Sequence, residues 1–90
     1  MYKINKSDKF IRDAKKFLKK HPNLQKKFNN IIMLLVSNPF DKALKTHKLS
    51  GKLDGLYSCS LDYQYRIILS IIIIDHQIYL VDIGTHDEVY

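Results

Sequence analysis

The sequence has one cysteine, two prolines, three glycines and no tryptophan. Because Cys59 has no second cysteine to pair with, an internal disulfide is excluded and we expect a reducing compartment, the cytoplasm. The glycines are scattered at Gly51, Gly55 and Gly84, which excludes a glycine-rich phosphate loop and a dinucleotide fingerprint. We therefore expect no cofactor.

Long hydrophobic runs are also missing. The longest apolar stretch, residues 67–74, covers eight positions and is interrupted by Ser70, whereas a membrane helix needs about 20 apolar residues. Neither end of the sequence carries a signal-peptide or lipidation pattern. We expect a cytoplasmic protein with no membrane partner.

The residues that could bind zinc lack the close spacing of a structural site; they are His21, Cys59, His47, His76 and His86. We therefore expect no metal. In addition, Cys59 alternates with Tyr57 and Leu61 in a strand-like segment. This pattern favours a buried thiol that fills space over a reactive nucleophile.

What the sequence does contain is enough apolar residues for one core and an uneven charge. The 90 residues, 46% of them hydrophobic, predict a single domain over residues 1–90. Residues 1–55 hold 14 Lys and Arg against 4 acidic residues, a net charge of +10, and residues 56–90 hold 1 Arg against 5 acidic residues, a net charge of −4. This asymmetry favours a polyanionic partner for the first half. The alternative is that the lysines only solvate the outer faces of helices.

The first half predicts two helices after a short strand at residues 2–5. Ser7 is a good N-cap, and apolar residues then recur at helical spacing, which predicts a helix over residues 7–20. The segment His21–Asn23 contains a proline and breaks the helix. A second apolar stripe runs from Leu24 to about residue 36, so we expect two antiparallel helices.

The second half predicts strands. Residues 37–55 contain Pro39 and two glycines without a sustained period, which indicates an irregular connection with no core. Three strand-like segments follow, at residues 56–61, 65–74 and 77–83. We expect an α+β fold in which two N-terminal helices pack on a small antiparallel β-sheet, in the order βααβββ.

Residues that suit phosphodiester chemistry gather in three places: the connection, the start of the second predicted strand and the end of the last. Arg66 and Gly84 should lie at the same end of the sheet, because their strands form a hairpin, and this places His86 near Arg66. Guanidinium binds phosphate, imidazole moves protons near neutral pH, and a phenol can stack on a base. The alternative is structural, with Arg66 paired to Asp62 or Asp82. The candidate residues are His47, Lys48, Lys52, Tyr65, Arg66, His86 and Tyr90.

Three of these stretches together resemble the RelE/ParE superfamily of bacterial type II toxins, and most of all its RelE/StbE and YafQ-like branch. The stretches are "THKLSG", which fits H-x-L-x-G, the strand opening "YRII", and the terminal "GTHDEVY". The resemblance covers the whole chain. It implies a RelE-like fold and an mRNA interferase, an endoribonuclease that cuts messenger RNA without metal, usually on the ribosome, and is held by a cognate antitoxin.

The resemblance also implies site residues. His47 matches the histidine of the H-x-L-x-G motif, Arg66 the arginine that binds the scissile phosphate, His86 the C-terminal catalytic histidine, and Tyr90 the terminal aromatic residue. Lys48, Lys52 and Tyr65 are expected to bind RNA. Which histidine is base and which is acid stays open.

Two positions depart from the pattern. YafQ-like members tend to have a further His and an Asp where this sequence has Ser60 and Gln64. An alternative function follows from this incomplete set, because the ParE branch shares the fold and inhibits DNA gyrase by protein binding without catalysis. His86 favours the nuclease, since ParE members usually lack that histidine.

Overall fold

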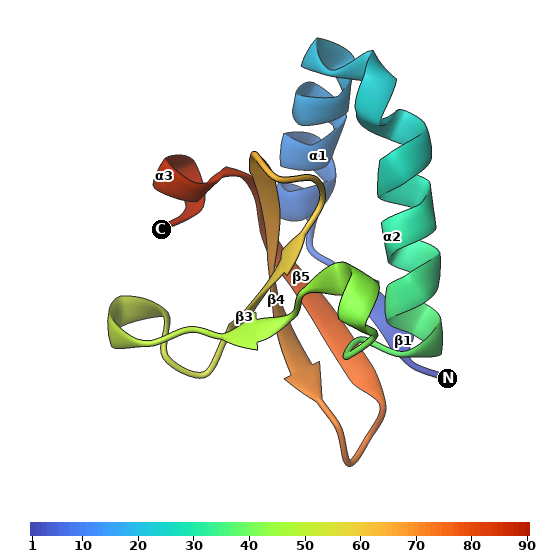
Figure 1. Cartoon of the computed structure of the whole chain (residues 1–90), viewed down its shortest axis with the longest axis vertical. Coiled ribbons are helices and arrows are strands. Elements are labelled where there is room, and N and C mark those ends of the chain that lie inside the picture. The colour runs from blue at the N-terminus through green and yellow to red at the C-terminus, as the bar shows by residue number, and fades with distance from the viewer.

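Two long helices cover one face of a five-stranded sheet in the computed structural model, which describes residues 1–90 (Figure 1). A third, short helix lies on the other side of the sheet from α1 and α2 (Figure 1). The elements are β1 (Lys3–Lys6), α1 (Asp8–Lys20), α2 (Gln25–Ser37), β2 (His47–Lys48), β3 (Tyr57–Ser60), β4 (Tyr65–Ile72), β5 (Gln77–Thr85) and α3 (His86–Val89), with 3₁₀ turns at Pro22–Leu24, Lys42–Leu44 and Gly51–Leu53.

The first helix begins where the sequence predicts. The Ser7 hydroxyl oxygen accepts a hydrogen bond from the Phe10 N–H at 3.0 Å, and Asp8 lies in the first turn, where a carboxylate suits the helix dipole. The helix ends at Lys20, and the cap N–H of His21 donates to the Phe17 carbonyl oxygen at 3.0 Å. The predicted helix over residues 7–20 is confirmed.

The second helix follows after the Pro22–Leu24 turn and runs antiparallel to α1 (Figure 1). Its buried side chains, Ile31 and Leu35, lie one helical turn apart on the stripe that the sequence predicts. It ends before Pro39, as expected. No helix in the structure combines the length and the apolar character needed to cross a membrane.

The strand order is β1-β5-β4-β3-β2, and β2 to β5 form an antiparallel meander. The expected α+β fold is confirmed, but the pairing of the first strand differs from the antiparallel sheet that was expected. The first strand pairs with β5 in parallel, with Lys3 opposite Gln77, because α1 and α2 carry the chain across before the meander begins. The Asn5 side chain strengthens this edge, since its Nδ2 donates to the Gln77 side-chain oxygen and to the Ile78 carbonyl, each at 3.0 Å.

The connection over residues 37–55 also differs from its prediction, because it contributes to the core and adds a strand. Leu44 is fully buried and Pro39 is nearly so. Asp41 caps a 3₁₀ turn, its Oδ1 accepting from the Ala43 N–H at 2.9 Å, and Lys45 reverses the chain at φ 51°. Single apolar residues anchor this segment to the core, so its sequence has no repeating hydrophobic pattern from which burial could be predicted.

The two faces of the sheet differ in their partners. Alternate residues of β3, β4 and β5 face α1 and α2 and form the core with Phe10 and Leu35. The opposite face, called the far face below, carries the cross-strand row Ser60, Arg66, Gly84 and the row His47, Ser58, Ile68, Asp82. Helix α3 packs on this far face, where its Val89 is buried beside Gly84.

Candidate functional site

The register of the sheet brings Arg66 opposite Gly84 and Tyr65 opposite Thr85. His86 follows Thr85 directly and begins α3, so its backbone lies beside the first residues of β4. This confirms that the start of β4 and the end of β5 lie at the same end of the sheet, as the sequence predicts.

The Arg66 guanidinium has no acidic partner. The two ion pairs of the structure are Lys9 with Asp13 and His86 with Asp87. The proposed structural partners of Arg66 instead bond to the backbone: Asp62 Oδ1 accepts from the Gln64 and Tyr65 N–H groups at 2.8 and 2.9 Å, and Asp82 Oδ1 accepts from the Ile83 N–H at 2.9 Å. The structural alternative for Arg66 is therefore not realised, and a partly buried cation remains available to an anion.

Helix α3 holds His86 and Tyr90 in place through a capping box. Thr85 Oγ1 accepts from the Glu88 N–H at 3.2 Å, and Glu88 Oε1 accepts from the Thr85 N–H at 2.8 Å. The bond from the Thr85 backbone lowers the pKa of Glu88, which keeps this carboxylate ionised. The His86 and Tyr90 rings stack at a centroid distance of 4.1 Å and an angle of 60°. His86 Nδ1 lies 3.7 Å from Asp87 Oδ1 on an exposed surface.

Gly84 lies within β5 and lets α3 pack close to the sheet. Strand β5 continues through Gly84 to Thr85, and α3 then turns the chain. A Cβ atom at Gly84 would lie 3.1 Å from Glu88 Oε1 and 3.3 Å from Val89 Cγ1. The missing side chain therefore lets α3 approach the sheet closely and fixes where His86 stands.

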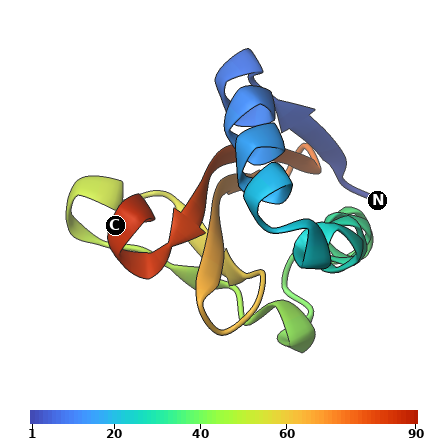
Figure 2. The ribbon, with the colours of Figure 1, turned by 90° about the horizontal axis from the view of Figure 1, so that it is seen from above.

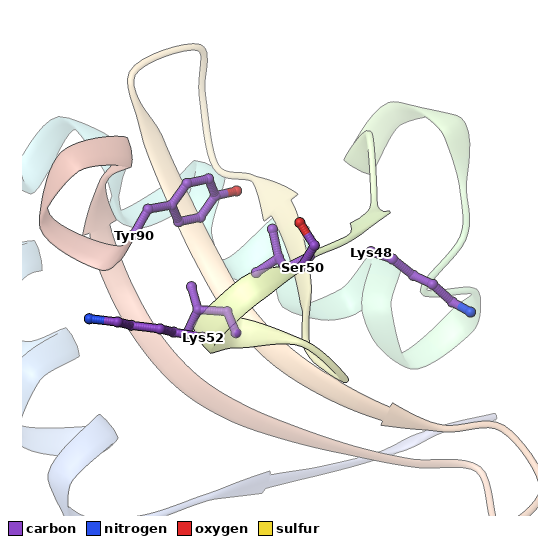
Figure 3. A pocket seen from close by; sticks show the side chains of 6 residues that line it. Lys48, Ser50, Lys52 and Tyr90 are labelled. Carbon is purple, nitrogen blue, oxygen red and sulfur yellow. The ribbon is translucent and has the colours of Figure 1, made fainter.

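A hollow of about 320 Å³ lies between the loop after β2 and the end of the chain (Figure 3). It is lined by Lys48, Leu49, Ser50, Lys52, Leu53 and Tyr90. The Tyr90 ring points toward Ser50, while the Lys48 and Lys52 side chains extend in different directions from the hollow (Figure 3). The structure thus brings together three of the residues that the sequence predicts for the site, Lys48, Lys52 and Tyr90. The amines of the two lysines face solvent on separate sides of Tyr90.

His47 shares the far face with Arg66 but stands apart from it. The register pairs His47 with Ser58 and Ser60 with Arg66, so two strand spacings and a two-residue step separate the two backbones. That offset amounts to about 12 Å. His47 is exposed, and its Nδ1 lies 3.2 Å from the Lys45 carbonyl oxygen.

Tyr65 is not part of this group. It lies on the helix side of β4, where its ring centroid is 4.9 Å from that of Phe17 and 4.8 Å from that of His21. Successive residues of a strand point to opposite faces, so Tyr65 and Arg66 diverge although they are adjacent in sequence.

Sequence reasoning did not place His21 near the candidate residues, because it considered this histidine only as part of a helix break and as a zinc ligand without suitably spaced partners. A histidine directly after a basic helix end was the available signal.

Two further observations limit the chemistry. Burial raises the pKa of the Cys59 thiol to about 12, although Arg66 opposes this, so the thiol stays protonated. No cluster of three or more His, Cys, Asp or Glu side chains is placed to hold a metal ion.

Residues 2–90 match the family model described as a bacterial toxin of type II toxin-antitoxin system, YafQ. No match was found among curated protein sequences.

Solved structures agree with the fold. YafQ from E. coli strain BL21(DE3) is 21% identical, with a TM-score of 0.81 over 100% of this chain and 99% of that one. A metal-bound toxin from Helicobacter pylori is 27% identical, with a TM-score of 0.81 over 100% of both chains. The E. coli DinJ-YafQ complex matches at 21% identity and a TM-score of 0.79, over 100% of this chain and 99% of that one.

Proposed function

This chain belongs to the YafQ family of type II toxin–antitoxin toxins, and we propose that it is a metal-independent endoribonuclease that cuts messenger RNA on the ribosome. The observation that carries the proposal is Arg66, a partly buried guanidinium with no acidic partner on the same sheet face as the α3 helix of His86 and Tyr90. A partly exposed guanidinium without an acidic partner is free to bind an anion such as a phosphate.

The proposed reaction is an internal transfer of phosphate. A base removes the proton of the ribose 2′-hydroxyl, the 2′-oxygen attacks the adjacent phosphorus, and the bond to the 5′-oxygen breaks as an acid protonates that oxygen. Arg66 offsets the charge that develops on the phosphoryl oxygens. His47 and His86 are the two proton carriers, and Tyr90 lies against the His86 ring at a centroid distance of 4.1 Å. Lys48 of β2 and Lys52 of the Gly51–Leu53 turn line the hollow beside Tyr90 and suit the flanking phosphates.

The alternative function, inhibition of DNA gyrase in the manner of ParE, finds no support. The family model that matches residues 2–90 is that of YafQ. The C-terminal His86 is present and is placed on an ordered, capped helix. We therefore keep the nuclease as the single candidate activity.

Cleavage is expected to need no metal and to leave 2′,3′-cyclic phosphate ends, because the nucleophile is the substrate's own 2′-hydroxyl and a guanidinium stabilises the charge. The measurement is to incubate the protein with translating ribosomes and map the 5′ ends of the message, and to repeat the cleavage on free RNA with EDTA. An RNA with 2′-deoxyribose at the cut position is the control and must survive. Activity that EDTA abolishes and a divalent ion restores, in the assay without ribosomes, contradicts the proposal.

We further propose that a cognate antitoxin covers the basic half of the chain. YafQ of E. coli has been crystallised as a complex with DinJ. In this chain six lysines stand exposed on the outer sides of the two long helices: Lys9, Lys15, Lys16, Lys19, Lys26 and Lys27. An acidic segment that folds along these helices gains both charge pairing and apolar contact.

Antitoxin and RNA are expected to compete, with different dependence on salt. RNA binding should weaken steeply between low and moderate salt, because counterion release drives it, whereas the antitoxin's apolar contacts keep much of its affinity. Titrations of each partner at several salt concentrations measure the two slopes. Equal slopes, or an antitoxin that binds without displacing RNA, show that neutralisation works differently.

A further inference from the structure

A second hollow, of about 350 Å³, lies on the helix side of the sheet, between α1 and the junction of β5 with α3. Its size is within the range of pockets that hold small ligands. It forms where β5 extends beyond its pairing with β1, which ends at Leu80. The lining residues are Asp13, Lys16, Phe17, Lys20, His21, Tyr65, Ile83, Gly84, Thr85 and Glu88. We call it the α1 pocket.

Aromatic rings form one wall of the α1 pocket. The centroids of Phe17, His21 and Tyr65 lie 4.6 to 4.9 Å from one another. Both His21 and Tyr65 are partly exposed, so a flat ligand can reach them. Rings that line an accessible pocket suit a planar heterocycle, because every nucleobase has a face that stacks.

The charged residues that line the α1 pocket favour a nucleobase over a free phosphate as its ligand. Lys16 and Lys20 are offset by Asp13 and Glu88, so the lining has no net charge and gives a free anion little attraction. Both carboxylates are already engaged: Asp13 Oδ2 with Lys9 Nζ at 2.8 Å, and Glu88 Oε1 with the Thr85 N–H at 2.8 Å. The exposed Lys16 and Lys20 amines therefore remain free to meet backbone phosphates at the rim.

The α1 pocket shares a wall with the candidate active site. Glu88 of α3 lines the α1 pocket, while Tyr90 lines the hollow on the other side. Helix α3 thus separates the two, and in Figure 2 it lies between α1 and the loop of residues 49–56. A single strand of RNA bound at Arg66 would reach the α1 pocket from the far face by crossing the end of β5.

We propose that the α1 pocket binds one unpaired base of the RNA substrate, a nucleotide flanking the cut, by stacking on His21 and Tyr65 with its phosphate at Lys16 and Lys20. This inference rests on the proposed nuclease function and deepens it. It predicts that substrate recognition depends on a base other than those at the cleaved bond, read on the opposite side of the sheet.

Binding of uncleavable RNA tests this inference without requiring catalysis. The probe is a single-stranded six-nucleotide RNA with 2′-O-methyl riboses, together with a set in which one base at a time is removed. For the unchanged protein, one flanking position should lower the affinity about tenfold when its base is absent, the size expected for one stacked base. The substitution His21→Ala should weaken binding of the intact RNA by a similar factor, and removing the same base should then have little further effect.

Matched variants keep the outcomes separate. Lys20→Ala should weaken binding by a few-fold, and Lys26→Ala, which removes an exposed lysine of α2 outside the α1 pocket, should weaken it less.

If His21→Ala and base removal each act fully and independently, or if no flanking base matters while the RNA binds, the α1 pocket is not a base site although the nuclease proposal stands. If the unchanged protein binds no RNA, this inference is overturned. If Arg66→Ala leaves cleavage intact while the His21 coupling is observed, the proposed catalytic site fails and the base site stands.

Discussion

Replacing Arg66 with alanine is expected to slow RNA cleavage by about 100-fold or more, which corresponds to about 3 kcal/mol of transition-state stabilisation. The reason is that the guanidinium is the one partly buried cation at the start of β4 and has no acidic partner of its own. Single-turnover cleavage of a fixed RNA by both proteins, at equal and saturating concentration, measures the effect. The free energy of unfolding should change little, because no ion pair is lost.

Two variants make this prediction specific. The chain has a second arginine, Arg12, exposed on α1, so Arg12→Ala removes the same charge without touching the far face. It should leave the cleavage rate unchanged. Arg66→Lys keeps the charge but loses the two-pronged hydrogen bonding, and should recover only part of the rate. An Arg66→Ala protein that is unfolded would show instead that the side chain holds the structure together.

The largest effect on stability is expected from Phe10→Ala. Phe10 is 1% exposed and lies at the centre of the core that joins α1 to the sheet. Removing a buried phenyl ring costs about 3–5 kcal/mol, because it loses the transfer energy and leaves a cavity. For a domain whose total stability is about 5–15 kcal/mol, that is a large share. Urea unfolding followed by circular dichroism measures the loss.

The neighbouring residue provides the control. Ile11 lies on the same turn of α1 but is 37% exposed. The substitution Ile11→Ala should therefore cost no more than about 1 kcal/mol. Equal losses at the two positions would mean that α1 does not pack on the sheet through Phe10.

The sequence predicted the elements whose apolar residues follow a regular local pattern. Helix α1 has a cap at Ser7 and a continuous apolar stripe, and β4 and β5 are rich in β-branched residues, so local patterns were sufficient. Strand β1 was predicted, but its parallel pairing with β5 was not, because its partner lies more than 70 residues away and register between distant segments leaves no local pattern. The burial of Leu44 was missed for a related reason, since one apolar residue in a loop has no period.

The candidate site was likewise predicted only where local geometry was sufficient. Hairpin geometry was enough to place Arg66 beside the end of β5, and the register confirms it. The separation of Tyr65 from Arg66 follows from the alternation of a strand, but the sequence does not say which face the helices cover. The α1 pocket could not be predicted, because it combines the end of α1, the start of β4 and α3, three segments that meet only in the folded chain.

The parallel edge strand affects when the protein can finish folding. Strand β1 is synthesised more than 70 residues before its partner β5, so the sheet can close only after Gln77 has been made and can pair with Lys3. Contacts between such distant segments form slowly, since a long loop must close before they are gained. A nascent chain that has not yet reached β5 therefore has neither its full sheet nor α3. The candidate site is therefore complete only after β5 and α3 have been made, later than the two helices that the proposed antitoxin covers.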